Sequence, residues 1–391
     1  MAEIDKNSLK ETAIRLSNTT KEYAKRYFVE GIEIKKEPRI KILRGFRGVG
    51  KTTALLQMLS GQAFYFSMDN PQVERFSLYE LGKNLVLSGN DVLLIDEIHH
   101  YKNWKRDTKA LYDEFTNLSI VASGSAPLAF EPERRYEIWD IEPLSLKEFL
   151  ELGGKKIQRN DTWINPEASL KFVAENSWLY EFYDQYLNGG GFPAYFSYKE
   201  KTLPSIYHSI KKSIREDAVL LANADGEMVM AMERTIIFLA TSKLGEFSIN
   251  SLSSVVEINK NKAYQMVALL ESMKILRLVR PYGRGSKLVR GEPKLMFYHP
   301  NLRKAICNAL NMQVDIGAQR EEMAVFALLS RGWSVNTIKG MKKSPDYIIE
   351  KGKERIIIEI GGPSKGKGQL RGFEEKTLVL DDRSLIVLGL F

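Results

Sequence analysis

The feature that most constrains this chain is the stretch from Arg44 to Thr53, which reads R-G-F-R-G-V-G-K-T-T. It matches the pattern G-x-x-x-x-G-K-T, a loop whose backbone N–H groups surround phosphate oxygens. An apolar run with β character precedes it at 40–43, and residues 53–59 follow with helical composition and no helix breaker. Strand, glycine-rich turn and helix in this order predict a P-loop NTPase fold, an α/β fold with a parallel sheet.

The residue types of the loop suit the binding of a nucleoside triphosphate. Glycines allow the tight turn that directs N–H groups inward, and the helix that begins near Lys51 adds its positive dipole end. Lys51 is expected to reach the β and γ phosphates, and the Thr52 hydroxyl to hold Mg²⁺. The predicted nucleotide-binding residues are Gly45, Arg47, Gly48, Val49, Gly50, Lys51, Thr52 and Thr53.

Residues 92–97 read V-L-L-I-D-E and supply the second part of the predicted site. Four consecutive apolar residues predict a strand buried on both faces, and carboxylates at its end are costly unless they meet a cation. Near a phosphate-binding loop, we expect Asp96 to organise Mg²⁺ and Glu97 to polarise the attacking water. We interpret His99 and His100 as polar residues that shape the site rather than metal ligands, because no further ligands cluster nearby in the sequence.

Two further strands end in polar residues. Residues 118–126 end in hydroxyl residues, so Ser123, or Ser125 as second choice, is a candidate to contact the γ phosphate; an ordinary strand-to-turn Ser-Gly is the alternative. Asp69 follows a short strand at 63–66. It could line the nucleotide cleft, but we favour the cap of a helix that begins near residue 71.

The adjacent pair Arg134 and Arg135 lies shortly after the serine-rich strand. Either side chain is a candidate arginine finger, which would stabilise the transferring phosphate from a neighbouring subunit and would require a homo-oligomer. Solvated surface arginines are the alternative interpretation.

The motifs, taken in order, resemble a group of prokaryotic AAA-type ATPases in which a C-terminal region of unknown function often follows the ATPase domain; the archaeal ATPase family is similar in layout. The motifs are G-x-x-x-x-G-K-T, S-M-D, L-L-I-D-E, A-S-G-S, P-L-S-L-K-E-F and G-G-F-P. The resemblance covers the whole chain and is most specific over residues 40–150. It implies that Lys51 and Thr52 are Walker A ligands, that Asp96 and Glu97 form the Walker B motif, and that Ser123 is sensor-like.

Composition changes along the chain predict boundaries near 150, 245 and 312. The predicted parts are an AAA+ core with an N-terminal helix (1–150), a helical lid (151–245), a winged helix (246–312) and a small α/β domain (313–391). Two helices followed by a basic hairpin are typical of a winged helix. Its recognition helix would present Asn259, Lys260, Asn261, Lys262 and Gln265, and its wing Arg280, Arg284, Lys287 and Arg290. These residues fit contact with double-stranded DNA, and protein packing is the alternative.

The last part resembles the PD-(D/E)xK nuclease core, in which two carboxylates hold a metal ion and a lysine activates water. Asp346 and Glu359 fall on two successive predicted strands after a helix that contains glutamates. Position 361, where the lysine is expected, is Gly361, and only Lys365 or Lys367 from a loop could replace it. We therefore predict a binding-type nuclease fold rather than an active nuclease.

Composition sets the remaining expectations. The chain has 391 residues, is 44% hydrophobic and carries a net charge of +8, which is compatible with a nucleic-acid partner. The single cysteine, Cys307, excludes an internal disulfide. No apolar run approaches the roughly 18 residues that span a bilayer, and the first residues lack a signal-peptide core, so we expect no membrane partner and a cytoplasmic protein.

The predicted function is an ATPase that uses ATP and Mg²⁺ and acts as a switch or motor on DNA. The alternatives are a DNA-binding module or a metal-dependent nuclease regulated by ATP.

Overall fold

The computed structural model describes residues 5–125, 133–245, 247–283, 291–338, 345–361, 370 and 373–391. The chain divides into two compact units, Met1–Glu142 and Pro143–Phe391. The division falls before the boundary expected near 150, because helix α6 (Leu146–Leu152) contributes its apolar side chains to the core of the second unit. The finer division into four parts remains a prediction.

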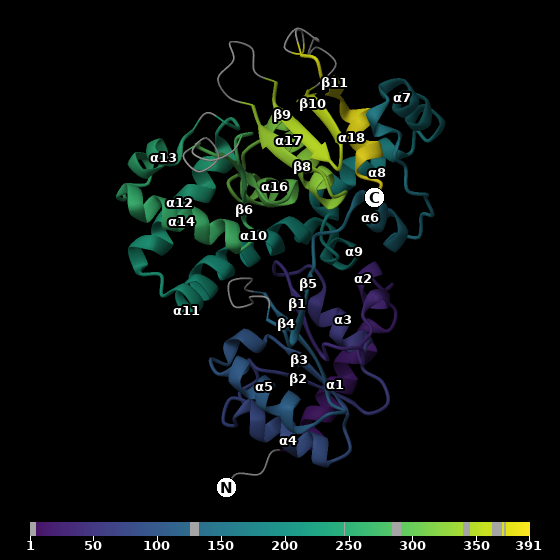
Figure 1. Ribbon diagram of the computed structural model, residues 1–391, viewed down its shortest axis with the longest axis vertical. Coiled ribbons are helices and arrows are strands. Elements are labelled where there is room, and N and C mark those ends of the chain that lie inside the picture. Colours follow the sequence, from purple (N-terminus) through teal and green to yellow (C-terminus); the bar gives the residue numbers. More distant parts are fainter. Residues whose placement is uncertain are drawn as a thin grey trace. The chain divides into compact units, whose positions relative to one another are not determined.

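The first unit is an α/β structure around one parallel sheet, as predicted (Figure 1). Its five strands lie in the order β2-β3-β4-β1-β5, so the strand before the loop is flanked on both sides. Strand β5 was not predicted. The elements are α1 (Lys6–Thr20), α2 (Tyr27–Gly31), β1 (Ile40–Arg44), α3 (Lys51–Gln57), β2 (Ala63–Ser67), α4 (Leu78–Leu87), β3 (Val92–Asp96), the short η1 (Ile98–His100), α5 (Trp104–Glu114), β4 (Ser119–Gly124) and β5 (Tyr136–Asp140).

Sequence patterns explain most of these elements. Strands β3 and β4 are buried along their whole length, as expected of parallel strands covered on both faces. Helices α1 and α3 pack together on one side of the sheet, and α4 and α5 pack together on the other (Figure 1). Helix α4 begins at Leu78 behind a capping box made by Ser77 and Glu80. The helix start expected near residue 71 was therefore wrong, and Asp69 does not cap a helix.

The second unit begins with helices and ends with a sheet. Its first elements are α6, η3 (Thr162–Ile164), α7 (Pro166–Glu175), α8 (Leu179–Gln185), η4 (Tyr186–Gly190), α9 (Ala194–Tyr198), η5 (Lys199–Lys201), α10 (Thr202–Lys212), η6 (Ser213–Asp217), α11 (Ala218–Ala222) and α12 (Gly226–Thr241). They continue with α13 (Ile249–Val255), α14 (Lys260–Ser272), β6 (Leu276–Val279), β7 (Lys294–Phe297), α16 (Pro300–Ala309), α17 (Ile316–Ser330), β8 (Ser334–Thr337), β9 (Tyr347–Lys351), β10 (Glu354–Ile360), β11 (Lys376–Leu380) and α18 (Asp382–Leu388).

Two sheets organise the second unit. Strands β6 and β7 form an antiparallel pair next to helix α14, and α14 also packs against α12 and α13. The larger sheet has the order β11-β10-β9-β8, in which β10 and β11 are parallel and the other pairs are antiparallel. Helices α17 and α18 pack against each other and share one apolar core with this sheet.

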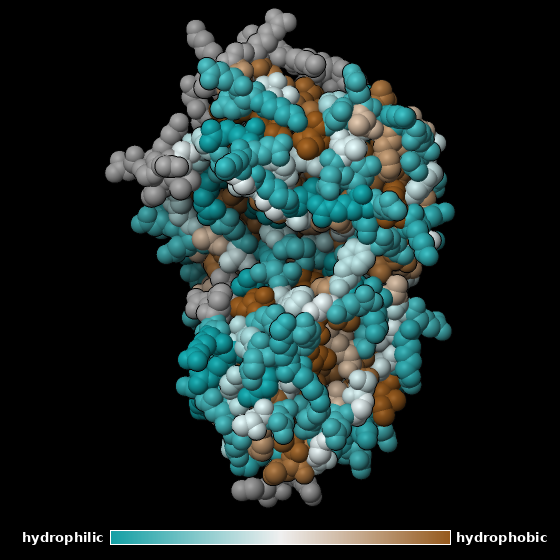
Figure 2. All heavy atoms as spheres, turned by 45° about the vertical axis from the view of Figure 1, so that its right-hand side comes forward, coloured by the Kyte–Doolittle hydropathy of each residue, from teal (hydrophilic) through white to brown (hydrophobic). Residues whose placement is uncertain are grey.

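One face of the molecule is mainly polar (Figure 2). The face visible in Figure 2 is largely hydrophilic, with small apolar areas between the polar side chains. Among the helices that the structure describes, none combines the length and the apolar character needed to cross a membrane.

Candidate nucleotide-binding site

The glycine-rich loop joins the end of β1 to the start of α3. Gly48 and Gly50 have φ angles of 84° and 96°, a left-handed backbone conformation that favours glycine. The Lys51 side chain is buried, and its Nζ donates hydrogen bonds to the carbonyl oxygens of Gly45 (2.8 Å) and Phe46 (3.0 Å). The ammonium group therefore lies across the loop, at the positive end of helix α3.

Two contacts with neighbouring segments fix the position of the loop. Arg26, which precedes helix α2, donates from Nη1 to the carbonyl oxygens of Val49 (2.6 Å) and Glu142 (2.9 Å). A Cβ atom on Gly45 would lie 2.3 Å from the Ile141 carbonyl oxygen, so the first glycine permits the close approach of the chain that follows β5. The contact of Arg26 with the loop was not predicted, because Arg26 lies 23 residues before Val49 and no local sequence pattern links the two.

Asp96 ends the fully buried strand β3 and accepts several hydrogen bonds. The Tyr65 hydroxyl donates to its Oδ2 at 3.1 Å, and the Ser123 hydroxyl donates to its Oδ1. The Thr52 hydroxyl of the loop lies close enough to this carboxylate to lower the pKa of Asp96. The structure therefore places the two predicted magnesium ligands, Thr52 and Asp96, near each other.

The surroundings of Asp96 disfavour the charged form of its carboxyl group. Burial, and next the nearby Glu97 carboxylate, raise the pKa of Asp96, and the hydrogen bonds from Ser123, Thr52 and Tyr65 lower it in part. A nearby cation would stabilise the ionised form of this buried carboxyl group, because opposite charges attract.

Ser123 lies inside the sheet rather than at an exposed strand tip. It is fully buried, and besides its bond to Asp96 its Oγ accepts from the backbone N–H of Glu97 at 3.3 Å. Ser125 instead donates from its hydroxyl to Glu97 Oε2 at 3.2 Å. The two candidate serines therefore contact the two carboxylates, one each, and the phosphate contact expected of Ser123 remains a prediction.

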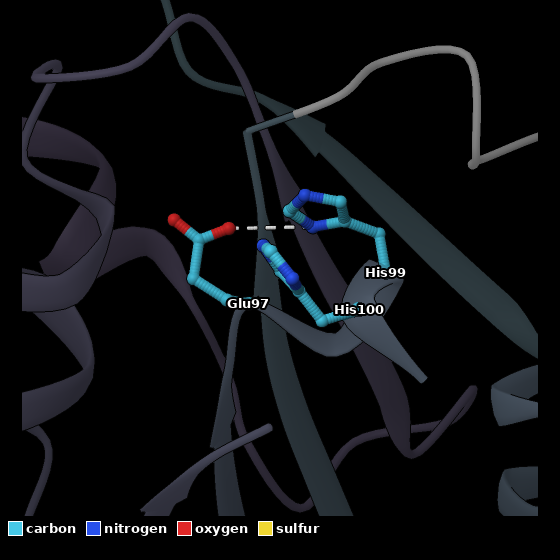
Figure 3. Close-up of side chains that lie close together, drawn as sticks. All are labelled: Glu97, His99 and His100. Atoms are coloured by element: carbon cyan, nitrogen blue, oxygen red, sulfur yellow. Dashed lines mark ion pairs between the residues drawn. The ribbon is translucent and has the colours of Figure 1, made fainter. Parts of the chain in front are cut away.

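Glu97 turns the chain sharply after β3. Its φ of 48° is left-handed, which is uncommon for a residue with a side chain. The turn continues into η1, and it brings His99 and His100 back toward the Glu97 carboxylate (Figure 3). The Glu97 Oε2 lies 3.3 Å from His99 Nδ1. One candidate ligand atom from each of the three side chains lies within 4.8 Å of the others.

His100 connects this turn to other charged groups. Its pKa is lowered, first by burial and next by the neighbouring His99 ring; the carboxylates of Glu97 and Asp69 raise it and the Arg47 guanidinium lowers it. The influence of Asp69 and Arg47 on His100 indicates that both side chains lie near the end of β3. Asp69 therefore lies near His100, and its predicted alternative role, the lining of the nucleotide cleft, remains a prediction.

Arg134 and Arg135 lie far from these residues in the first unit. They precede β5, whose first residue, Tyr136, is in register with Ile40 at the start of β1. The loop follows the opposite end of β1, so the arginines lie at the other edge of the sheet. Arg135 Nε pairs with Asp113 at 3.2 Å, and Arg134 is exposed.

Oxygen atoms are the main candidate metal ligands in the inner part of the site, where Thr52 lies near Asp96. Hydroxyl and carboxylate oxygens are the ligands that Mg²⁺ prefers, with water in its remaining positions. The residues present therefore fit a magnesium ion.

Tyr65 also contacts Asp96, and this role was not predicted, because Tyr65 lies in β2, outside both motifs in the sequence.

Some of the predicted DNA-contacting residues of the second unit are exposed to solvent, and others form ion pairs within the protein. Asn259, Lys260, Asn261 and Gln265 are exposed at the start of α14. Lys262, in contrast, pairs with Asp225 (2.9 Å) and with Glu227, and Arg280 pairs with Glu271 at 3.3 Å. Arg284, Lys287 and Arg290 lie outside the described residues.

Asp346 and Glu359 lie close together, and the nuclease-like character of this part remains a prediction. Glu359 Oε2 accepts from the backbone N–H of Asp346 at 3.1 Å, and Asp346 Oδ2 accepts from the N–H of Ile360 at 2.7 Å. On helix α17, Glu322 is buried in an ion pair with Arg303, and Glu321 accepts from the Tyr347 hydroxyl at 2.6 Å. Lys365 and Lys367 lie outside the described residues.

Residues 37–150 match the AAA domain, and residues 180–313 match a domain of unknown function, DUF8612. The chain is 28% identical over 373 residues to the uncharacterized protein MJ1637 of Methanocaldococcus jannaschii, a match over 85% of this chain and 78% of that protein. It is 25% identical over 363 residues to an uncharacterized protein of Haemophilus influenzae, a match over 85% of each.

Solved structures give weaker similarity. The RuvB Holliday junction branch migration motor of Thermotoga maritima has a TM-score of 0.30 at 16% identity, over 78% of this chain and 96% of that chain. A STAND signal-transduction ATPase of Pyrococcus horikoshii, PH0952, has a TM-score of 0.29 at 12% identity, over 79% of this chain and 46% of that chain. Similarity at this level supports no inference about function. The match by sequence is to the AAA domain, and it spans the loop, Asp96, Glu97 and Ser123.

Proposed function

We propose that the first unit binds ATP with Mg²⁺ and hydrolyses it. The observation that carries this proposal is the proximity of Thr52, in the glycine-rich loop, to the Asp96 carboxylate at the end of β3. The glycine-rich loop and a buried carboxylate that a cation would stabilise therefore lie together at the carboxyl edge of a parallel sheet. The AAA domain match over residues 37–150 supports the same activity.

Each residue has a defined role in this proposal. The backbone N–H groups of residues 45–50 and the positive end of α3 bind the phosphates, and the Lys51 ammonium neutralises charge on the β and γ phosphates. Thr52 and Asp96 would hold Mg²⁺, which would supply positive charge against the negative charge that develops during phosphoryl transfer. Glu97 orients and polarises the attacking water, while Ser125 and His99 fix the direction of its carboxylate.

The Lys51→Ala variant tests nucleotide binding. We expect ATP affinity to fall by roughly 30-fold or more, because a buried cation opposite phosphate is lost. Isothermal titration with ATP and Mg²⁺ measures the change. Lys109→Ala, an exposed lysine on α5, is the matched control and should keep the parental affinity. If both variants bind ATP equally well, the loop is not the nucleotide site.

Oligomerisation would supply an arginine finger. Arg134 and Arg135 are too distant from the loop of their own chain to reach it, so only a neighbouring copy could present them. Arg134 is the better candidate, because it is exposed while Arg135 is engaged with Asp113. The expected result is that Arg134→Ala lowers turnover without weakening ATP binding, and that parental turnover per chain rises with protein concentration. Turnover per chain that is independent of concentration would contradict this role.

DNA contact by the second unit is a second candidate function. The arrangement of α12, α13 and α14 followed by the pair β6–β7 supports a winged helix, and α14 begins with exposed Asn259, Lys260 and Asn261. The carboxylate partners of Lys262 reduce the positive charge that this surface offers. A salt titration of duplex binding tests the proposal, because phosphate-driven affinity falls steeply with salt. No binding at low salt would remove it.

Nuclease activity has less support than either function. Asp346 and Glu359 are close together, but Gly361 stands where the activating lysine is expected, and both carboxylates accept backbone N–H groups. The expected result is no Mg²⁺- or Mn²⁺-dependent cleavage of plasmid DNA. Cleavage that is lost in Glu359→Ala would establish an active nuclease.

A further inference from the structure

We infer that Glu97, His99 and His100 form a binding site for a divalent transition-metal ion of the zinc type, separate from the magnesium position at Thr52 and Asp96. All three side chains come from the end of β3 and the turn η1, and they point toward one another (Figure 3). Within the described residues, this is the one group of three or more histidine, cysteine or acidic side chains whose ligand atoms lie this close.

The geometry suits a small ion. Zinc binds imidazole nitrogen and carboxylate oxygen at about 2.0–2.2 Å, so two ligand atoms of a tetrahedral site lie about 3.3–3.6 Å apart. The distance from Glu97 Oε2 to His99 Nδ1 is 3.3 Å. The ligand atom of His100 lies within 4.8 Å of the other two, and a movement of its side chain toward them would complete the set.

The ligand types favour a different metal from that of the nucleotide. Two imidazoles and one carboxylate suit Zn²⁺, Co²⁺ or Ni²⁺, whereas Mg²⁺ prefers oxygen ligands alone. His99 is buried and His100 is exposed, so the site has one fixed ligand and an open side toward solvent. Asp69 adds negative charge near His100, and Arg47 adds positive charge that opposes the ion.

Occupation of this site would regulate the proposed ATPase, a consequence that rests on the proposed function. The Glu97 carboxylate oxygen that binds the transition metal is no longer available to polarise water. The ion should therefore inhibit hydrolysis while ATP binding at Lys51 and Thr52 continues. A rigid Glu97–His99 pair that merely orients the carboxylate would bind no metal.

The test uses untagged full-length protein and Co²⁺ as a spectroscopic probe. We expect a visible absorption band of low-coordinate Co²⁺ at one ion per chain, displaced by Zn²⁺ and retained in excess Mg²⁺. His100→Ala should weaken Co²⁺ binding by about tenfold or more, since even the loss of a residue that only supports a ligand has that effect. His99→Gln provides a second variant that keeps a polar side chain. His208→Ala removes an exposed histidine of α10 and is the matched control.

Hydrolysis is then measured at fixed Mg²⁺ and buffered free Zn²⁺, each variant relative to its own zinc-free rate. Zinc should inhibit the parent and the His208→Ala control, and should inhibit His100→Ala only at roughly tenfold higher concentration. No Co²⁺ band in the parent, or an equal band in folded His100→Ala and His99→Gln, overturns the site. Zinc binding without inhibition overturns the regulatory consequence alone. A protein that binds Co²⁺ but hydrolyses no ATP overturns the proposed function and leaves the metal site standing.

Discussion

Two pairs of carboxylates, one in each unit, lie at or beside apolar strands but have different structural partners. Asp96 ends an apolar strand in the first unit and Glu97 follows it, whereas in the second unit Asp346 immediately precedes β9 and Glu359 lies on the neighbouring strand β10. The first pair meets the side-chain hydroxyls of Thr52, Tyr65, Ser123 and Ser125. In the second pair, each carboxylate accepts a backbone N–H from the other strand or its end.

This difference separates a ligand site from a structural connection. Hydroxyl partners can turn away when a cation or water arrives, so the first pair can exchange its contacts during a reaction. Backbone N–H groups are fixed by the sheet, so the second pair ties β9 to β10. In this chain, displaceable hydroxyl partners and the glycine-rich loop accompany the first pair.

The largest expected effect comes from the first pair alone. Asp96→Ala should lower ATP turnover by roughly a thousandfold, because charge stabilisation at the reacting phosphate is lost with the magnesium ligand. Asp346→Ala, the matched change in the second unit, should leave turnover within about twofold of the parent. Steady-state phosphate release measures both variants. Equal losses would show that the two carboxylate pairs act together, against the contrast drawn between them.

A smaller effect is expected from Tyr65, which donates to Asp96 at 3.1 Å. Tyr65→Phe removes one hydrogen bond to a charged group, so the Mg²⁺ concentration for half-maximal turnover should rise by roughly tenfold. Tyr112→Phe is the control, because it removes a comparable bond to Glu37 away from the site. If turnover falls with no change in the Mg²⁺ requirement, Tyr65 does not act through Asp96.

Stability should change in opposite directions at the two sites. The pKa of Asp96 is raised, chiefly by burial, so the folded nucleotide-free protein disfavours its charge. Stability of the first unit should fall as pH rises through this raised pKa, and Asp96→Asn should remove that fall and stabilise the unit by about 1 kcal/mol at neutral pH. Asp346→Asn should destabilise the second unit by about 1 kcal/mol, because a charge-assisted bond to Ile360 is weakened.

Hydrogen exchange of peptides from each unit, followed across pH, distinguishes these two changes. Peptides from β4 report on the first unit and peptides from β10 on the second. Destabilisation by both substitutions would indicate that Asp96 is a structural carboxylate like Asp346.

The smallest expected effect concerns DNA. Lys260 is exposed whereas Lys262 is paired with two carboxylates, so Lys260→Ala should weaken duplex binding about two- to threefold and reduce the salt slope by about 1. Lys262→Ala should change the slope less. Fluorescence anisotropy at several salt concentrations measures both. A larger effect at Lys262 would mean that its ion pairs open on binding.

Local patterns predicted the parts of the fold that depend on sequence neighbours. The loop, its flanking strand and helix, and strand β3 follow from glycine spacing and apolar runs. Strand β5 was not predicted, because its mixed sequence Y-E-I-W-D lies at an edge and pairs with β1, nearly a hundred residues earlier in the chain. Tyr65 and Arg26 were missed for the same reason: their roles come from tertiary contacts. The clustering of His99 and His100 with Glu97 depends on the left-handed turn at Glu97, which no residue pattern indicated.

The most direct test of the central claim compares ATP binding and turnover in Glu97→Gln. The amide keeps the size and the hydrogen-bonding capacity of the side chain but cannot accept a proton from water. We predict that ATP binding with Mg²⁺ remains within about threefold of the parent, while turnover falls by roughly 10²- to 10⁴-fold. Hydrolysis at the parental rate would contradict the account, because the carboxylate beside Asp96 would then have no part in the reaction.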